Sequence, residues 1–150
     1  MFRSTYILLL LAATVVACEK HETIEASYPD FQSAQKAGAI HGPALPSNLI
    51  PRSAKDIRSA FNLDTNEFWM SFRFAPADLS TMLSSCKDVP SSQVSYAYRS
   101  PPGSWWPGTL TQRASDVANR SAFKTYQCEG GGIIAVDTDK GIAFYWRLKV

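Results

Sequence analysis

The chain has 150 residues, of which 45% are apolar and 19% are charged. This length and composition fit a single globular domain with enough apolar side chains for one core. The 15 basic and 13 acidic residues give a formal net charge of +2. Because this charge is nearly balanced and no run of like charges occurs, nothing indicates a nucleic-acid or acidic-polymer partner.

Residues 1–17 have the character of an export signal. Arg3 supplies a positive start, and residues 6–17 are uncharged and largely apolar. This run is too short to span a membrane, which takes about 20 apolar residues, but it fits the apolar part of a secretory signal. We therefore expect residues 1–17 to be removed, which leaves 14 basic and 13 acidic residues.

The signal ends in Val15-Val16-Ala17-Cys18, which resembles the lipobox of bacterial lipoproteins. The resemblance implies that Cys18 becomes the mature N-terminus and carries a diacylglycerol and an amide-linked acyl chain such as palmitate. Two or three such chains make a durable membrane anchor, since each buried CH₂ contributes about 0.8 kcal/mol. The alternative is an ordinary secretory signal followed by a free thiol, which would be prone to oxidation.

The residue after Cys18 bears on location, because an aspartate there is the usual inner-membrane retention signal in bacteria with two membranes. Glu19 stands at this position, which favours the outer membrane. We predict a lipid-anchored protein facing the periplasm, with residues 18–30 as lipidated N-terminus and polar tether. Residues 31–150 are predicted to form a single domain.

The first half of this domain is predicted to hold a helix and a hairpin. Asp30 suits the N-cap of a helix over 31–37, which Gly38 can end. Three prolines within residues 40–52 exclude a regular helix or an inner strand and indicate an extended segment packed on the core. Apolar and polar residues alternate through 56–74 except at the turn-forming residues 64–67, which predicts an antiparallel hairpin.

The second half is predicted to begin with a helix over 76–87, whose apolar stripe Cys86 continues. Two further strands are predicted, over residues 94–98 and 123–128. Residues 109–121, which lie between them, are weakly patterned. A second hairpin is predicted from 133–136 and 142–148, with Gly141 in a left-handed position of its loop. The fold class is thus α+β, with an antiparallel sheet of about four to six strands, two short helices and one disulfide.

The disulfide is expected between Cys86 and Cys128, since disulfides persist in exported proteins. Pairing them closes a loop in the unfolded chain, which the chain-entropy model predicts to stabilise the folded protein by about 4 kcal/mol. Two buried free thiols or a redox pair are the alternatives. Redox pairs usually occur as Cys-x-x-Cys, a motif that neither cysteine belongs to.

Residues 99–108 contain the strongest candidate for a binding surface. Their prolines and glycines keep the segment out of regular structure, while Trp105 and Trp106 offer large rings with one N–H donor each. Because aromatic anchors are typical of protein interfaces, we predict that Trp105 and Trp106 contact a periplasmic protein partner. In the alternative, one or both indoles fold back over the core, which avoids exposing two adjacent tryptophans.

No cofactor, metal site or catalytic residue is predicted. The acidic runs at 64–67 and 137–139 lack the glycine and glutamate that an EF-hand calcium loop requires, and hairpin turns explain them. His21 and His41 each stand alone in the sequence. The motifs of serine hydrolases, zinc proteases and phosphate-binding loops are absent from the sequence.

Two short patterns carry a family resemblance. Residues 51–57 read Pro-x-Ser-Ala-x-Asp-Ile, and residues 63–69 read Leu-Asp-Thr-Asn-x-x-Trp. Over about residues 43–75 the chain resembles a group of small bacterial proteins, often lipoproteins, to which the resemblance assigns neither an activity nor catalytic residues. We therefore predict a cell-envelope lipoprotein that acts by binding. The alternatives are an inhibitor or immunity lipoprotein against a periplasmic enzyme or effector, and a carboxylate-dependent hydrolase.

Overall fold

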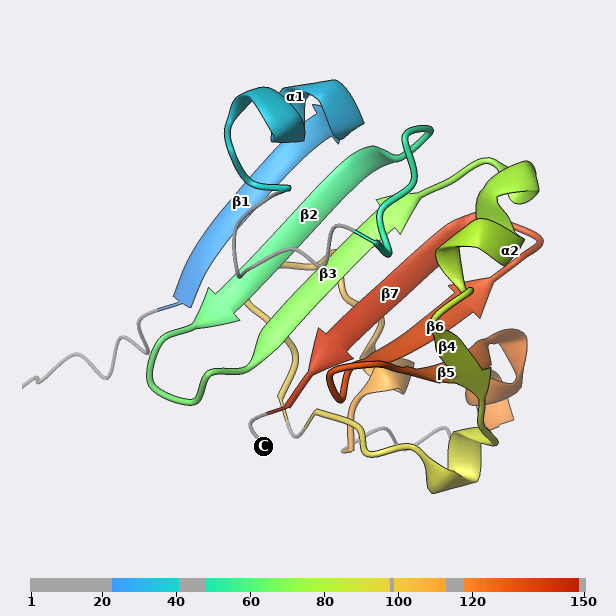
Figure 1. Ribbon diagram of the computed structural model, residues 1–150. Helices are drawn as coiled ribbons and strands as arrows, with labels where there is room; N and C mark the ends of the chain where they lie inside the picture. The colour runs from blue at the N-terminus through green and yellow to red at the C-terminus, as the bar shows by residue number, and fades with distance from the viewer. Residues whose placement is uncertain (1–22, 41–47, 98, 113–117, 149–150) are drawn as a thin grey trace, which may run out of the picture.

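The computed structural model describes residues 23–40, 48–97, 99–112 and 118–148. They form one antiparallel seven-stranded sheet in the order β1-β2-β3-β7-β6-β5-β4, with chain packed on both faces (Figure 1). No helix of these residues is long and apolar enough to cross a membrane. The predicted signal, the lipidation site Cys18 and both histidines lie outside the described residues.

The strands are β1 (Thr23–Asp30), β2 (Lys55–Asn62), β3 (Phe68–Arg73), β4 (Cys86–Asp88), β5 (Lys124–Cys128), β6 (Ile133–Asp137) and β7 (Ile142–Arg147). The helices are α1 (Phe31–Lys36) and α2 (Leu79–Met82), with short 3₁₀ helices η1 (Pro76–Asp78), η2 (Ser91–Gln93), η3 (Gly108–Leu110) and η4 (Ala118–Ala122).

The sheet has more strands than predicted, because residues assigned to the tether and to a helix join it. Residues 23–30, predicted to lie in the polar tether, form the edge strand β1, which pairs with β2 from Thr23↔Asn62 to Asp30↔Lys55. An edge strand needs to bury only part of its surface, so a strand as polar as β1 can fill this position. The fold class is otherwise as predicted, with an antiparallel sheet, two short helices and a cysteine pair at disulfide distance.

The first helix and both hairpins follow the sequence prediction. The Asp30 carboxylate accepts a hydrogen bond from the Ser33 backbone N–H at 2.8 Å and caps α1, and Gly38 follows the helix with φ of 72°. In the β2–β3 turn, Asn62 Oδ1 accepts from the backbone N–H groups of Asp64 and Thr65. Side-chain acceptors of this kind stabilise turns. The acceptor is the last residue of β2, however, and not one of residues 64–67, for which this role is predicted.

Two predicted elements are wrong in extent. The helix predicted over 76–87 is only η1 and α2, and Cys86 lies on β4 rather than on a helix stripe. Cys86 pairs directly with Cys128 of β5, so the disulfide partner and the strand ladder determine its conformation. The strand predicted over 94–98 is absent from the described part of that range, where Ala97 forms a single bridge to Thr111.

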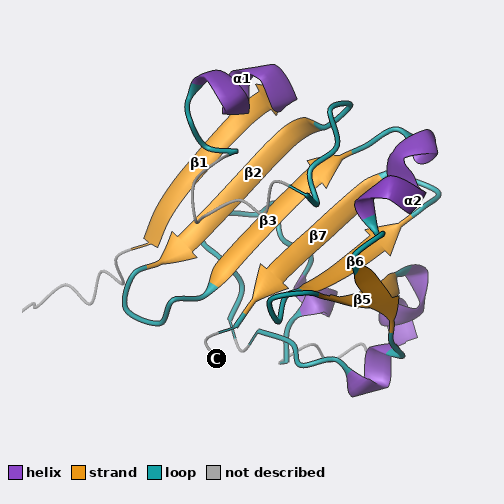
Figure 2. Cartoon of the chain, viewed as in Figure 1, coloured by secondary structure: helices purple, strands orange, loops and turns teal. Residues whose placement is uncertain are grey.

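The two faces of the sheet carry separate hydrophobic clusters. On the first face, α1, α2 and residues 48–54 cover a cluster that includes Ile57, Met70 and Ile134. On the second face, residues 89–97, 99–112 and 118–123, called the covering segment below, pack over a cluster centred on Trp146. Figure 2 shows the covering segment behind the sheet as loops and short helical turns.

Gly132 is required by close packing against Tyr145. A Cβ atom at Gly132 would lie 2.0 Å from the Tyr145 hydroxyl oxygen and 2.3 Å from its ring, which is itself buried. We expect Gly132→Ala to lower the free energy of unfolding by about 2 kcal/mol, as overpacked cores do. Urea unfolding measures this change, with Gly108→Ala as control, because a Cβ there meets no atom within 4 Å. Equal stability of the two variants would contradict the packing account.

Asp137 closes the β6–β7 turn with Lys140, whose backbone N–H and ammonium group donate to the carboxylate at 3.0 and 2.9 Å. Burial acts to raise the pKa of Asp137, but these bonds and the lysine charge outweigh burial and lower the pKa below its usual 3.8. The resulting stabilisation is complete above the unfolded pKa and is lost as the pH falls through the lowered one.

Asp137→Asn keeps an acceptor for the Lys140 backbone but removes the charge. We expect the variant to melt at a lower temperature than the wild type at neutral pH. The difference should shrink as the pH falls below the unfolded pKa and through the lowered pKa of the folded protein, where the wild-type carboxylate becomes protonated. Melting curves at a series of pH values measure this, and a difference that does not change with pH would contradict the ionic contribution.

Candidate functional site

The second face of the sheet is covered over its centre but open over β1 and β2. Glu25 lies opposite Ala60, and Ser27 lies opposite Arg58. Since Ala60 lies opposite Trp69, and Trp69 opposite Trp146, these side chains share the face on which the covering segment packs. The covering segment therefore ends against a polar strip of sheet.

A hollow of about 470 Å³ lies on this strip beside the covering segment. Strands β1 and β2 form its floor, and Trp105 of the covering segment forms a wall. The hollow is lined by Glu25, Ala26, Ser27, Tyr28, Pro29, Asp56, Ile57, Arg58, Ser59 and Trp105. We call this feature the β1–β2 hollow.

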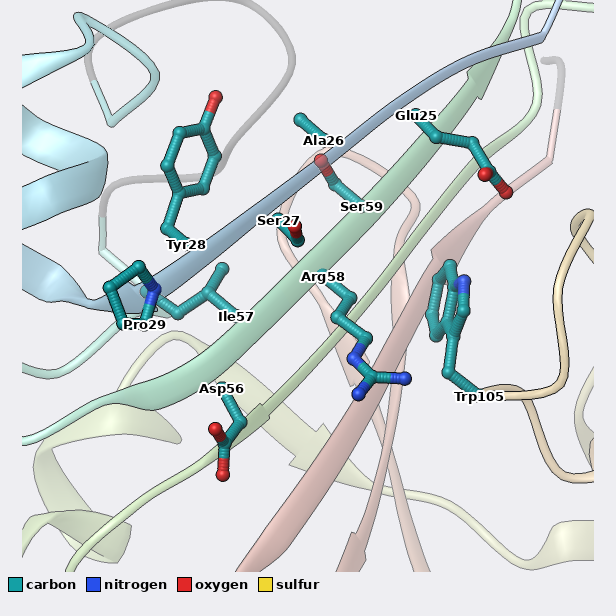
Figure 3. Close-up of a pocket in the computed structure, with 10 residues that line it drawn as sticks. All are labelled: Glu25, Ala26, Ser27, Tyr28, Pro29, Asp56, Ile57, Arg58, Ser59 and Trp105. Carbon is teal, nitrogen blue, oxygen red and sulfur yellow. The ribbon is translucent and has the colours of Figure 1, made fainter.

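Three side chains give the β1–β2 hollow its chemical character. Figure 3 shows Glu25 and Arg58 extending toward the Trp105 indole from the two strands, while Tyr28 and Ser59 project from the opposite face. Gly103 lies beside both Glu25 and Trp105, since a Cβ atom there would be 3.3 Å from Trp105 Nε1 and 3.8 Å from Glu25 Oε1. The hollow thus combines a carboxylate, a guanidinium and an aromatic surface.

A β-bulge lies at one end of the hollow. The register of β2 against β3 shifts from Lys55↔Arg73 to Arg58↔Ser71, which leaves one extra residue on β2. Asp56 lies within the bulge and has a φ of 50°. This is a left-handed conformation, which aspartate tolerates better than most residues do. Such bulges re-aim the side chains beside them, and Arg58 follows two residues after Asp56.

Neither of the charged side chains that face Trp105 forms an ion pair with another residue in the described part of the chain. The one ion pair found there joins Lys140 to Asp137, at the β6–β7 turn. Arg58 and Glu25 are both exposed, so each can bind a group of opposite charge from another molecule. A guanidinium can bind a carboxylate through two parallel hydrogen bonds.

Side-chain contacts hold the covering segment on the sheet on both sides of Trp105. Trp146 Nε1 donates to the Ser95 carbonyl at 2.9 Å. The guanidinium of Arg120 donates to the carbonyls of Thr109 and Thr111 and lies 4.0 Å from the centre of the Tyr96 ring. The wall of the hollow therefore belongs to a segment that is packed on the sheet.

The structure separates the two predicted tryptophans. Trp106 is 5% exposed and packs edge-on against Phe144 and Trp146, with ring centres 5.6 and 6.0 Å away. Trp105 is partly exposed and faces the hollow. Trp106 thus belongs to the core beneath the loop, and Trp105 remains as the candidate for contact with a partner.

The other predicted site residues lie elsewhere. Cys86 and Cys128, with sulfur atoms 2.02 Å apart, join β4 to β5 at the sheet edge opposite β1. Cys18 lies outside the described residues. Sequence reasoning missed Glu25 and Arg58 as site residues, although Ile24, Ala26 and Tyr28 alternate with polar residues and could have indicated that Glu25 lies on a strand.

A second hollow, of about 520 Å³, lies between the β2–β3 turn and the covering segment. The Tyr96 hydroxyl on its wall donates to the Ser91 carbonyl, and Arg120 stacks on the Tyr96 ring. Burial raises the pKa of the Tyr96 phenol, so it stays protonated at neutral pH. Because Tyr96 is already engaged, we assign the candidate site to the β1–β2 hollow.

Residues 22–73 match the family model of the YbbD head domain, which points to a bacterial family. The match spans β1, α1, β2 and β3, so it includes Glu25 and Arg58 but neither Trp105 nor the disulfide. No curated protein and no solved structure matches the chain.

Proposed function

We propose that this chain is a lipid-anchored binding protein of the cell envelope, which faces the periplasm and recognises a protein partner with the β1–β2 hollow. The resemblance of Val15–Cys18 to a lipobox supports the anchor. The outer membrane is the expected location where the host has one. The proposal assigns no catalytic residue and no cofactor.

The observation that carries the binding role is the pair of exposed, oppositely charged side chains beside Trp105, neither of which forms an ion pair within the described residues. Tryptophan and arginine are enriched among residues that dominate binding at protein interfaces, where they lie at desolvated positions. Trp105 and Arg58 occupy adjoining sides of one open hollow. A partner that places an acidic group against Arg58 and a basic group against Glu25 would complement this surface.

Capture from the native envelope tests the proposal. The full chain with a C-terminal tag is crosslinked in cells, and the proteins that purify with it are identified by mass spectrometry. We expect Arg58→Ala and Trp105→Ala to lower recovery of the partner by about tenfold or more, the effect of losing a dominant interface residue. Arg52→Ala is the matched control, because Arg52 is an exposed arginine outside the hollow.

The identity of the partner separates the forms that a binding function can take. An enzyme or effector recovered in near-equal amount would identify an inhibitor or immunity protein, whereas an envelope component would identify a scaffold. Equal recovery from all three variants, or no recovered partner, would contradict the proposal. Turnover of a substrate that is lost in Glu25→Gln would instead favour a carboxylate-dependent hydrolase.

A further inference from the structure

The exposed large apolar side chains of the described residues are gathered at one end of the sheet. Ile24 is 58% exposed and Leu63 is 43% exposed, and these two are the large hydrophobic residues of the described ranges that are classed as exposed. Thr23 lies opposite Asn62 and Ile24 opposite Phe61, so Ile24 and Leu63 lie at the same end of neighbouring strands. Single exposed apolar residues are common on protein surfaces, but Ile24 and Leu63 lie together at one end of the sheet.

The position matters because the chain leads from this end to Cys18. Strand β1 begins at Thr23, so residues 19–22 alone separate it from the predicted lipidation site. Five residue steps span at most about 17 Å when fully extended. A lipid on Cys18 would therefore keep the end of the sheet with Ile24 and Leu63 within about this distance of the membrane surface, whereas the predicted tether to residue 30 would have left the domain free.

We propose that Ile24 and Leu63 dock into the lipid surface and fix the orientation of the domain on the membrane. This inference rests on the proposed lipid anchor and adds a second contact to it. The β2–β3 turn beside Leu63 carries Asp64 and Glu67, which anionic headgroups would repel. The contact is therefore apolar, and it should persist at high salt.

In this orientation the sheet stands away from the membrane. Arg147 at the end of β7 lies opposite Phe68, next to the β2–β3 turn, whereas the β6–β7 turn lies at the other end of the strands. A strand of six residues is about 20 Å long, so the β6–β7 turn would stay in water. The β1–β2 hollow lies on a face of the sheet between these ends, where a periplasmic partner can reach it.

Fluorescence quenching in vesicles tests the docking. The full lipidated chain is reconstituted in phosphatidylethanolamine–phosphatidylglycerol vesicles that contain a nitroxide-labelled phospholipid. An NBD fluorophore is placed at Asp64→Cys or, as the matched control, at Asp139→Cys in the β6–β7 turn; both positions are exposed. The added cysteine is the single labelled thiol when Cys86 and Cys128 are paired and Cys18 is acylated.

We expect the lipid quencher to act several-fold more strongly on the label at position 64 than at position 139, in low and in high salt. Adding Ile24→Gln and Leu63→Gln should reduce quenching at position 64 several-fold, toward the level at position 139, and unchanged quenching at position 64 would overturn the docking. Equal quenching at the two positions in the unaltered background would overturn the docking.

Two further measurements distinguish a failure of the docking from a failure of the lipid anchor. They are flotation with the vesicles and the mass of the N-terminal peptide. A chain that floats with acylated Cys18, but whose label at position 64 is not quenched, overturns the docking and leaves the anchor intact. A chain that lacks acyl mass on Cys18 overturns both.

Discussion

Replacing Trp106 with alanine is expected to lower the free energy of unfolding by about 4 kcal/mol, the range for a buried aromatic side chain. The Trp106 ring packs edge-on against Phe144, Trp146 and Trp105, and its Nε1 donates to the Leu110 carbonyl at 3.4 Å. Its removal leaves a cavity between the covering segment and the sheet. Urea unfolding followed by far-ultraviolet circular dichroism measures the loss.

Trp105→Ala is the matched control, because the adjacent ring is partly exposed at the β1–β2 hollow. We expect Trp105→Ala to lower the free energy of unfolding by about 1 kcal/mol, since the Trp105 ring buries less apolar area than the Trp106 ring does. A Trp105→Ala variant as unstable as Trp106→Ala would place both rings in the core. It would also remove the aromatic wall from the proposed site.

The second large effect is expected from the disulfide. Replacing both Cys86 and Cys128 with alanine should lower the free energy of unfolding by about 4 kcal/mol, because the unfolded chain loses the constraint of a loop with sequence separation 42. The two cysteines face each other across β4 and β5. Strand β4 has only three residues and lies at a sheet edge, so we expect it to detach first.

Reduction of the wild type provides the control for this substitution. The reduced wild type and the double alanine variant should unfold at similar urea concentrations, both below that of the oxidised wild type. Two thiols that react with an alkylating agent in the absence of reductant would contradict the pairing.

Much of the sheet could be predicted because its strands are strongly apolar and are separated by turn residues. The β2–β3 hairpin combines a period-two apolar pattern with a polar turn, and the β6–β7 hairpin joins the continuous apolar run 133–136 to residues 142–148 through a polar turn that ends in Gly141. Strand β1 escaped prediction because Glu25, Ser27 and Asp30 make its composition resemble a tether. Pairing with β2 stabilises it, and a long-range contact of this kind leaves little trace in the local sequence.

The covering segment was the hardest part to predict, for a physical reason. It has almost no ladder hydrogen bonds, and side chains such as Arg120 and Trp146 hold its backbone through hydrogen bonds to carbonyl groups. The sequence predicts a binding role for Trp105 and Trp106 but carries no period that distinguishes the buried ring from the partly exposed one. The site residues Glu25 and Arg58 become visible only when β1 and β2 are paired.

The most direct test of the central claim is site-specific photocrosslinking from the floor of the β1–β2 hollow. A photoreactive amino acid at Ser27, which lies opposite Arg58, is compared in living cells with the same amino acid at Thr138, an exposed residue of the β6–β7 turn. We predict one discrete protein adduct from position 27 that Arg58→Ala abolishes, and none from position 138. Adducts from both positions, or none from position 27, would contradict binding at this hollow.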